Sequence, residues 1–135
     1  MTPSTALPFL DTGVLMARVD PRDNRHSLSL ALYPGGPAVT TNFVLDELCT
    51  LALARRGAAF ALRVAEALWA PSPLVVERVT AEDERVARQH FVRFAGVGAS
   101  FTDCTSFALI ERLGIRTAYS FDRHFRLVGS LAVAP

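Results

Sequence analysis

Short apolar runs alternate with longer helical patterns along this chain, and this alternation constrains the fold more than any other feature. The runs that have the length of strands cover residues 6–11, 38–40, 74–79, 117–121 and 131–133. Runs that are apolar throughout are typical of parallel strands buried on both faces. The sequence therefore predicts an α/β fold, with a mostly parallel sheet flanked by helices.

Local signals predict where the helices between these strands begin and end. Helical patterns cover residues 12–18, 24–33, 42–56, 58–70, 80–94 and 100–113. Gly57 is expected to stop one helix. Thr80, with Asp83 three residues later, is typical of a capping box. Ser100 or Thr102 is expected to cap the last helix.

Composition excludes several classes of protein. With 135 residues, half of them hydrophobic, the chain suits one domain with a buried core and is not disordered. No apolar run reaches the roughly 18 residues of a membrane helix. The N-terminus lacks the pattern of a signal peptide, so we expect a cytoplasmic protein with no membrane partner. Cys49 and Cys104 match no zinc pattern and are expected to be reduced, buried thiols.

The net charge of +1 does not by itself indicate nucleic-acid binding. The kind of positive charge is more informative, because all 14 basic residues are Arg. Arginine suits bidentate contacts to phosphate. A GC-rich genome explains the same bias, and the two explanations are compatible.

Four acidic residues adjoin apolar runs in four separate parts of the chain. They are Asp11, Glu47, Asp103 and Asp122. An acid at a strand end or in an early helical turn points to the rim of an α/β sheet, where such folds hold ligands. Carboxylates gathered there repel one another, and a hard cation such as Mg²⁺ would neutralise them. The pattern predicts a metal-dependent enzyme.

Each of the four acids lies in a different short sequence segment. The segments are Leu10-Asp11-Thr12-Gly13-Val14-Leu15, Thr40-Thr41-Asn42-Phe43-Val44-Leu45-Asp46-Glu47, Ser100-Phe101-Thr102-Asp103-Cys104 and Ser120-Phe121-Asp122-Arg123-His124-Phe125. In order and spacing they resemble the motifs of PIN-domain proteins of the VapC type, the toxin half of toxin–antitoxin pairs. The resemblance covers most of the chain, but residues 58–95 carry little of it.

The resemblance implies a single PIN-like domain over residues 1–135, with about five parallel strands. It also implies a Mg²⁺- or Mn²⁺-dependent endoribonuclease, in which the four acids form the catalytic, metal-binding pocket. RNA would be the substrate, and a homodimer and an antitoxin protein would be the partners. Neighbouring residues are candidates for hydrogen-bonding a carboxylate or a metal-bound water, or for contacting RNA. These are Thr12, Thr102, Ser120, Arg123, His124 and Arg126.

Each assignment has an alternative. Asp11 and Asp103 could serve only as helix N-terminal residues, and Asp122 could only begin a turn. Glu47 could be an exposed helical acid. The apolar helix over residues 58–70 fits a core or a dimer interface equally well. For function, a structure-specific DNA nuclease and a non-catalytic partner-binding module remain open, and a phosphatase or small-molecule hydrolase is a weaker rival.

Overall fold

Five short strands form one sheet in the computed structural model, which describes residues 7–129 and 131–135. The strands are β1 (Phe9–Leu10), β2 (Ala38–Thr41), β3 (Leu74–Glu77), β4 (Thr117–Tyr119) and β5 (Ala132–Ala134). Their order is β3-β2-β1-β4-β5, and every pairing is parallel. The predicted α/β class and parallel sheet are confirmed. Residue 6, the expected start of the first strand, lies outside the described residues.

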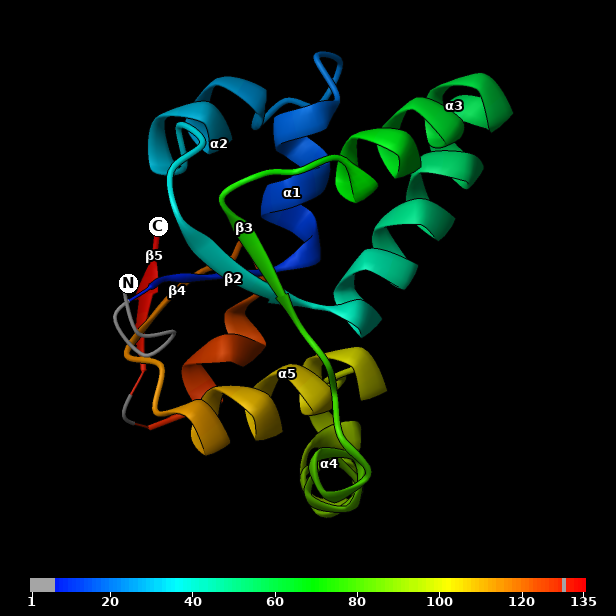
Figure 1. The fold of residues 1–135 in the computed structure, drawn as a ribbon. Helices are drawn as coiled ribbons and strands as arrows, with labels where there is room; N and C mark the ends of the chain where they lie inside the picture. The colour runs from blue at the N-terminus through cyan, green and yellow to red at the C-terminus, as the bar shows by residue number, and fades with distance from the viewer. Residues whose placement is uncertain (1–6, 130) are drawn as a thin grey trace.

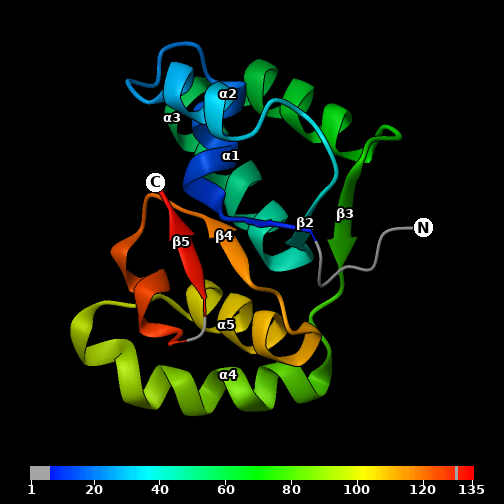
Figure 2. The ribbon, with the colours of Figure 1, turned by 90° about the vertical axis from the view of Figure 1, so that its left-hand side faces the viewer.

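Helices cover both faces of the sheet (Figure 1, Figure 2). On one side lie α1 (Thr12–Val19), α2 (His26–Leu32) and α3 (Asn42–Trp69), and on the other lie α4 (Ala81–Phe94) and α5 (Phe101–Leu113). Two short 3-10 helices complete the fold, namely η2 (Ala95–Val97) and η3 (Arg123–Leu127). No helix in the described ranges has both the length and the apolar character needed to cross a membrane.

Helix α3 has two arms that meet at Gly57. The backbone there has φ 80° and ψ 178°, a conformation that is open only to glycine. The chain therefore turns back on itself, as Figure 1 shows. The predicted break at Gly57 is present, although helical hydrogen bonding runs on either side of it. The Thr41 side chain caps the first arm by accepting from the N–H of Val44, at 3.0 Å.

Helix α5 lies at the centre of the molecule. Every residue from Asp103 to Ile110 is buried, so this helix is covered on all sides. Phe107 packs edge-on against Phe125 of η3, with ring centroids 5.1 Å apart, and Phe125 stacks on Phe9 of β1 at 6.0 Å. This aromatic contact joins α5, η3 and the central strand, which are the elements that carry three of the four acids.

The second arm of α3 buries some of its apolar side chains in the core and exposes others to solvent. Phe60 and Val64 are buried in the core, whereas Leu62 and Trp69 are 69% and 82% exposed. Of the two cysteines, Cys104 is buried as expected, but Cys49 is only partly buried. Both thiols are free.

Candidate active site

The sheet reverses its direction of growth between β1 and β4. From β1 the chain builds outward through β2 to β3, whereas β4 and β5 extend the sheet on the opposite side. The connections that leave β1 and β4 therefore diverge at the carboxyl ends of the two strands, which is where open α/β sheets usually bind their ligands. Asp11 follows β1 directly, and its N–H donates to the carbonyl of Tyr119 at the end of β4, at 3.1 Å. Strand pairing thus brings two acidic segments together that are more than a hundred residues apart.

Ser120 links Asp11 and Asp122 at this edge of the sheet. Its hydroxyl donates to Asp11 Oδ2 at 2.8 Å and accepts from the N–H of Asp122 at 3.0 Å. Asp11 is 5% exposed, so its carboxylate is held in a largely dry position. Beside it, the Thr12 hydroxyl is buried and has no hydrogen-bond partner among the described residues.

Asp103 reaches the same place from the start of α5. Ser100 caps this helix, because its hydroxyl accepts from the N–H of Asp103 at 3.0 Å. Asp103 Oδ2 in turn accepts from the N–H of Ser100 at 2.9 Å, which completes a capping box. Of the two expected caps, Ser100 is therefore the one used. The box occupies one carboxylate oxygen and orients the side chain, so the capping role and a ligand role are compatible.

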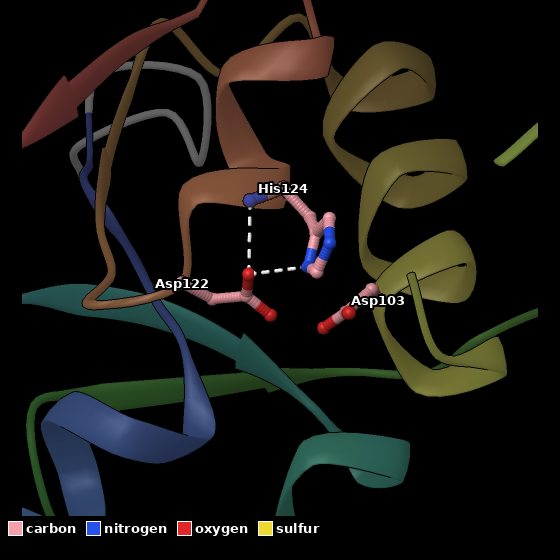
Figure 3. A group of neighbouring side chains, drawn as sticks. All are labelled: Asp103, Asp122 and His124. Atoms are coloured by element: carbon pink, nitrogen blue, oxygen red, sulfur yellow. Dashed lines mark hydrogen bonds and ion pairs between the residues drawn. The ribbon is translucent and has the colours of Figure 1, made fainter. Parts of the chain in front are cut away.

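His124 joins Asp103 and Asp122 in a compact group (Figure 3). One potential ligand atom from each of the three residues lies within 4.8 Å of the other two. Asp122 Oδ1 caps η3 by accepting from the N–H of His124 at 2.9 Å, and it also lies 2.6 Å from the ring Nδ1. The opposite ring atom, Nε2, lies 2.7 Å from the carbonyl of Val97 in η2. The two-residue spacing of Asp122 and His124 suggested proximity, but the backbone contact to Val97 has no sequence signature.

Burial and the repulsion of neighbouring acids hold the pKa of two carboxyls, Asp11 and Asp103, above the ordinary value. Burial raises the pKa of Asp11 to about 7; the Ser120 hydrogen bond opposes this, and the charges of Asp103 and Asp122 add to it. Burial likewise raises the pKa of Asp103 to about 6, with a further contribution from Asp122. Within residues 7–129 and 131–135, no arginine forms an ion pair with these acids. The site therefore combines excess negative charge with oxygen donors and one imidazole nitrogen, which suits a divalent cation.

Glu47 stands apart from this group in its interactions. It lies on the second turn of α3 and is partly buried. It makes no hydrogen bond or ion pair with the other three acids in the described part of the chain. The start of α3 nevertheless faces the group across the carboxyl ends of the strands, and α3 contacts α5.

The side chains of the remaining candidate residues form no hydrogen bond or ion pair with the acids in the described part of the chain. Thr102 accepts, through its carbonyl, a hydrogen bond from the Thr105 hydroxyl at 2.7 Å. Arg123 is exposed at the start of η3. Arg126 is also exposed and donates to the carbonyl of Pro135 at 3.2 Å, so it contacts the chain end rather than the acids.

One arginine that precedes α2 also approaches the site. The Arg25 guanidinium lies 4.8 Å from the ring centroid of Phe121, the residue immediately before Asp122. A cation–π contact of this kind holds a positive group close to Asp122. In the sequence, Arg25 was only one of several arginines near the first helices, and nothing there distinguished it from the others.

An apolar groove lies elsewhere, between the two arms of α3 and strand β3. Its volume is about 640 Å³, and none of the four acids lines it. Its apolar walls include Leu53, Leu62 and Trp69. The groove therefore lies apart from the group formed by Asp103, Asp122 and His124.

A five-stranded parallel sheet with acids gathered at its carboxyl ends is the architecture expected of a PIN domain. The PIN domain family model matches residues 9–131, and the chain belongs to this family. Within the family, the chain is a homologue of the toxin ribonuclease VapC20. The "23S rRNA-specific endonuclease VapC20" of two Mycobacterium tuberculosis strains is 38% identical over 129 residues, covering 94% of this chain and 98% of the relative.

Solved structures agree with this placement. The crystal structure of Mycobacterium tuberculosis VapC20, described as a sarcin-ricin loop cleaving toxin, superposes with a TM-score of 0.84 at 35% identity, covering 94% of this chain and 98% of that one. DNA-bound VapBC from Salmonella typhimurium superposes with a TM-score of 0.69 at 17% identity, covering 95% of this chain and 97% of that one. FitAcB from Neisseria gonorrhoeae superposes with a TM-score of 0.67 at 15% identity, covering 96% of this chain and 97% of that one. At such low identity the last two show the fold alone.

Proposed function

We propose that this chain is a metal-dependent endoribonuclease that cleaves the sarcin-ricin loop of 23S rRNA as the toxin of a toxin–antitoxin pair. The observation that carries the proposal is the similarity to VapC20, a 23S rRNA-specific endonuclease, over nearly the full length of both chains. The group of acids at the carboxyl ends of the strands has the right chemistry, because it gathers carboxylates on elements of the folded core, and two of them, Asp11 and Asp103, are buried.

Asp11, Asp103 and Asp122 are proposed to hold one or two divalent cations, Mg²⁺ or Mn²⁺, and Glu47 is proposed to complete the set from α3. The donor set fits such an ion, since no arginine in the described residues pairs with these acids, and a cation would offset the burial and repulsion that raise the pKa of Asp11 and Asp103. A bound cation supplies charge neutralisation at the scissile phosphate and lowers the pKa of a water. The hydrogen bonds from Ser120 and Ser100 hold two of the carboxylates in fixed orientations.

Recognition of the RNA would rest on charge and shape. We propose that Arg123, exposed beside the acids, contacts backbone phosphates, and that Arg25 does so beside Phe121. Contacts to phosphates position a nucleic acid without reading its sequence. Selectivity for one loop would therefore come from the shape of the RNA and from its unpaired bases.

A toxin needs an inhibitory partner, and we propose an antitoxin protein and a homodimeric, cytoplasmic toxin. The exposed apolar residues Leu62 and Trp69 support a protein partner, because monomers rarely leave large side chains so open beside a groove.

The test is cleavage of a short RNA hairpin carrying the sarcin-ricin loop, compared with a hairpin of the same stem and a scrambled loop. Wild type, Asp11→Asn and Asp46→Asn would be assayed with Mg²⁺, Mn²⁺ or EDTA. Asp46 is an exposed acid one residue from Glu47, so its substitution is the matched control. We expect metal-dependent cleavage within the loop, unchanged in Asp46→Asn. In Asp11→Asn it should fall at least about a hundredfold, beyond the 10–100-fold typical of losing an outer-shell partner.

The other outcomes separate the rival functions. Equal cleavage of both hairpins would refute the loop specificity but keep the ribonuclease. Cleavage of DNA hairpins alone would favour a structure-specific DNA nuclease. Absence of cleavage in every metal would favour a non-catalytic partner-binding module.

A further inference from the structure

A hydrogen bond fixes one end of the imidazole ring of His124. Its Nε2 lies 2.7 Å from the carbonyl oxygen of Val97, an atom that only accepts hydrogen bonds. Nε2 must therefore carry a proton and donate it. In the neutral ring this leaves the lone pair on Nδ1, the nitrogen that faces the acids (Figure 3).

The surroundings of Nδ1 lack a partner suited to that lone pair. The atom is buried and has no hydrogen-bond partner among the described residues, because its approach to Asp122 Oδ1 at 2.6 Å lacks the angle of a hydrogen bond. A lone pair and a carboxylate oxygen so close repel each other. A cation between them would convert this repulsion into two favourable contacts, with Asp103 as a third ligand within the same 4.8 Å.

The ring is also held rigidly in place. The N–H of His124 donates to Asp122 Oδ1 at 2.9 Å, which ties its backbone to the neighbouring acid. At its Nε2 end the ring lies near Gly98, where a Cβ, if present, would make an ordinary van der Waals contact with Nε2 at 3.6 Å. Metal-binding histidines commonly donate their second ring N–H to a backbone carbonyl, which sets the tautomer and the orientation. Val97 performs that role here.

We propose that His124 binds the catalytic cation directly through Nδ1, together with Asp103 and Asp122, and that this nitrogen biases the site toward Mn²⁺ over Mg²⁺. The inference rests on the metal site of the proposed function and adds a fifth, non-carboxylate ligand to it. Mg²⁺ prefers oxygen ligands and readily keeps water in place of nitrogen, whereas imidazole suits transition metals better.

The test is electron spin echo envelope modulation of Mn²⁺ bound to the full chain, which detects directly coordinated ¹⁴N. The chain has three histidines, so the source can be assigned by substitution. His124→Gln keeps a donor near the position of Nε2 and removes Nδ1. His26→Gln is the matched control, since His26 bonds the carbonyl of Ala17 in α1 and takes no part in the acidic group. Thermal melts in EDTA would establish that both variants fold.

We expect a ¹⁴N signal in wild type and in His26→Gln, and none in His124→Gln. Mn²⁺ affinity in His124→Gln should fall at least about tenfold, and Mg²⁺ affinity, measured by competition, less than about threefold. Wild type without a ¹⁴N signal would overturn the inference and would indicate instead a doubly protonated ring paired with Asp122. Equal losses of Mn²⁺ and Mg²⁺ affinity would also overturn it. Neither result would touch the proposed ribonuclease activity, which fails if wild type binds no divalent ion or cleaves no RNA.

Discussion

Asp11→Asn should stabilise the metal-free protein, and increasingly so as pH rises. Burial and two neighbouring carboxylates raise the pKa of Asp11 to about 7, from an ordinary value of 3.8. The unfolded chain therefore loses this proton near pH 4, while the folded chain retains it until near pH 7. Between these values the folded state binds more protons, so wild-type stability falls as pH rises. Above about pH 7 both states are ionised and the penalty is constant.

The magnitude follows from the size of the shift. A difference of about three pH units, at 1.36 kcal/mol each, makes ionised Asp11 cost about 4 kcal/mol at pH 8. At pH 5 the cost is only about 1–2 kcal/mol by the same relation. Asparagine carries no charge, and its amide oxygen can still accept from Ser120. The advantage of the variant over wild type should thus grow by about 2–3 kcal/mol between pH 5 and pH 8.

Urea unfolding in EDTA at pH 5, 6, 7 and 8 measures this difference. Asp46→Asn serves as the control, because Asp46 is exposed and its substitution should leave the pH dependence parallel to that of wild type. Saturating Mn²⁺ should reverse the wild-type trend, since the cation binds the ionised carboxylates. The reasoning is refuted if wild type and Asp11→Asn unfold with parallel pH dependences in EDTA.

Two further substitutions test the scaffold by urea unfolding. Gly57→Ala should cost about 1–3 kcal/mol through backbone strain alone, because φ is 80° and nothing lies within 4 Å of an added Cβ. Gly96→Ala, equally open but without a positive φ, should cost far less, and similar losses would contradict the strain argument. Arg112→Met should cost about 2 kcal/mol, because it removes the bidentate partner of buried Asp83 at 2.8 and 2.9 Å. Arg85→Met breaks an exposed pair and should leave stability unchanged; an equal loss would show that burial does not decide the effect.

Local signals in the sequence were sufficient for the α-helices and strands, although not for the 3-10 helices η2 and η3. Both capping boxes form where Ser/Thr precedes Asp by three residues, at Thr80 with Asp83 and at Ser100 with Asp103. Gly57 interrupts α3 as predicted. The strands were predicted in the right places with some bounds displaced: the runs at 74–79 and 117–121 pair only as far as Glu77 and Tyr119, whereas the run at 38–40 continues to Thr41. Apolar character marks a buried segment, whereas hydrogen-bonded pairing also needs a neighbouring strand.

The resemblance to PIN-domain proteins also came from the sequence, because its motifs are short and contiguous. The family, the α/β fold and the endoribonuclease class were all predicted and are confirmed. The single-domain, homodimer and cytoplasmic assignments stay predictions, as do the catalytic roles of the individual residues.

Only the tertiary structure decided how the acids meet. The pairing of β1 with β4 brings Asp11 to Ser120 across 109 residues, and burial there raises the Asp11 pKa. The same packing makes His124, a sequence neighbour of Asp122, part of a compact group that also contains Asp103, through a contact to the backbone of Val97. Propensities and caps act over a few residues and can be read locally. Strand order, desolvation and contacts to backbone carbonyls depend on which distant segments pack together, and no single segment encodes them.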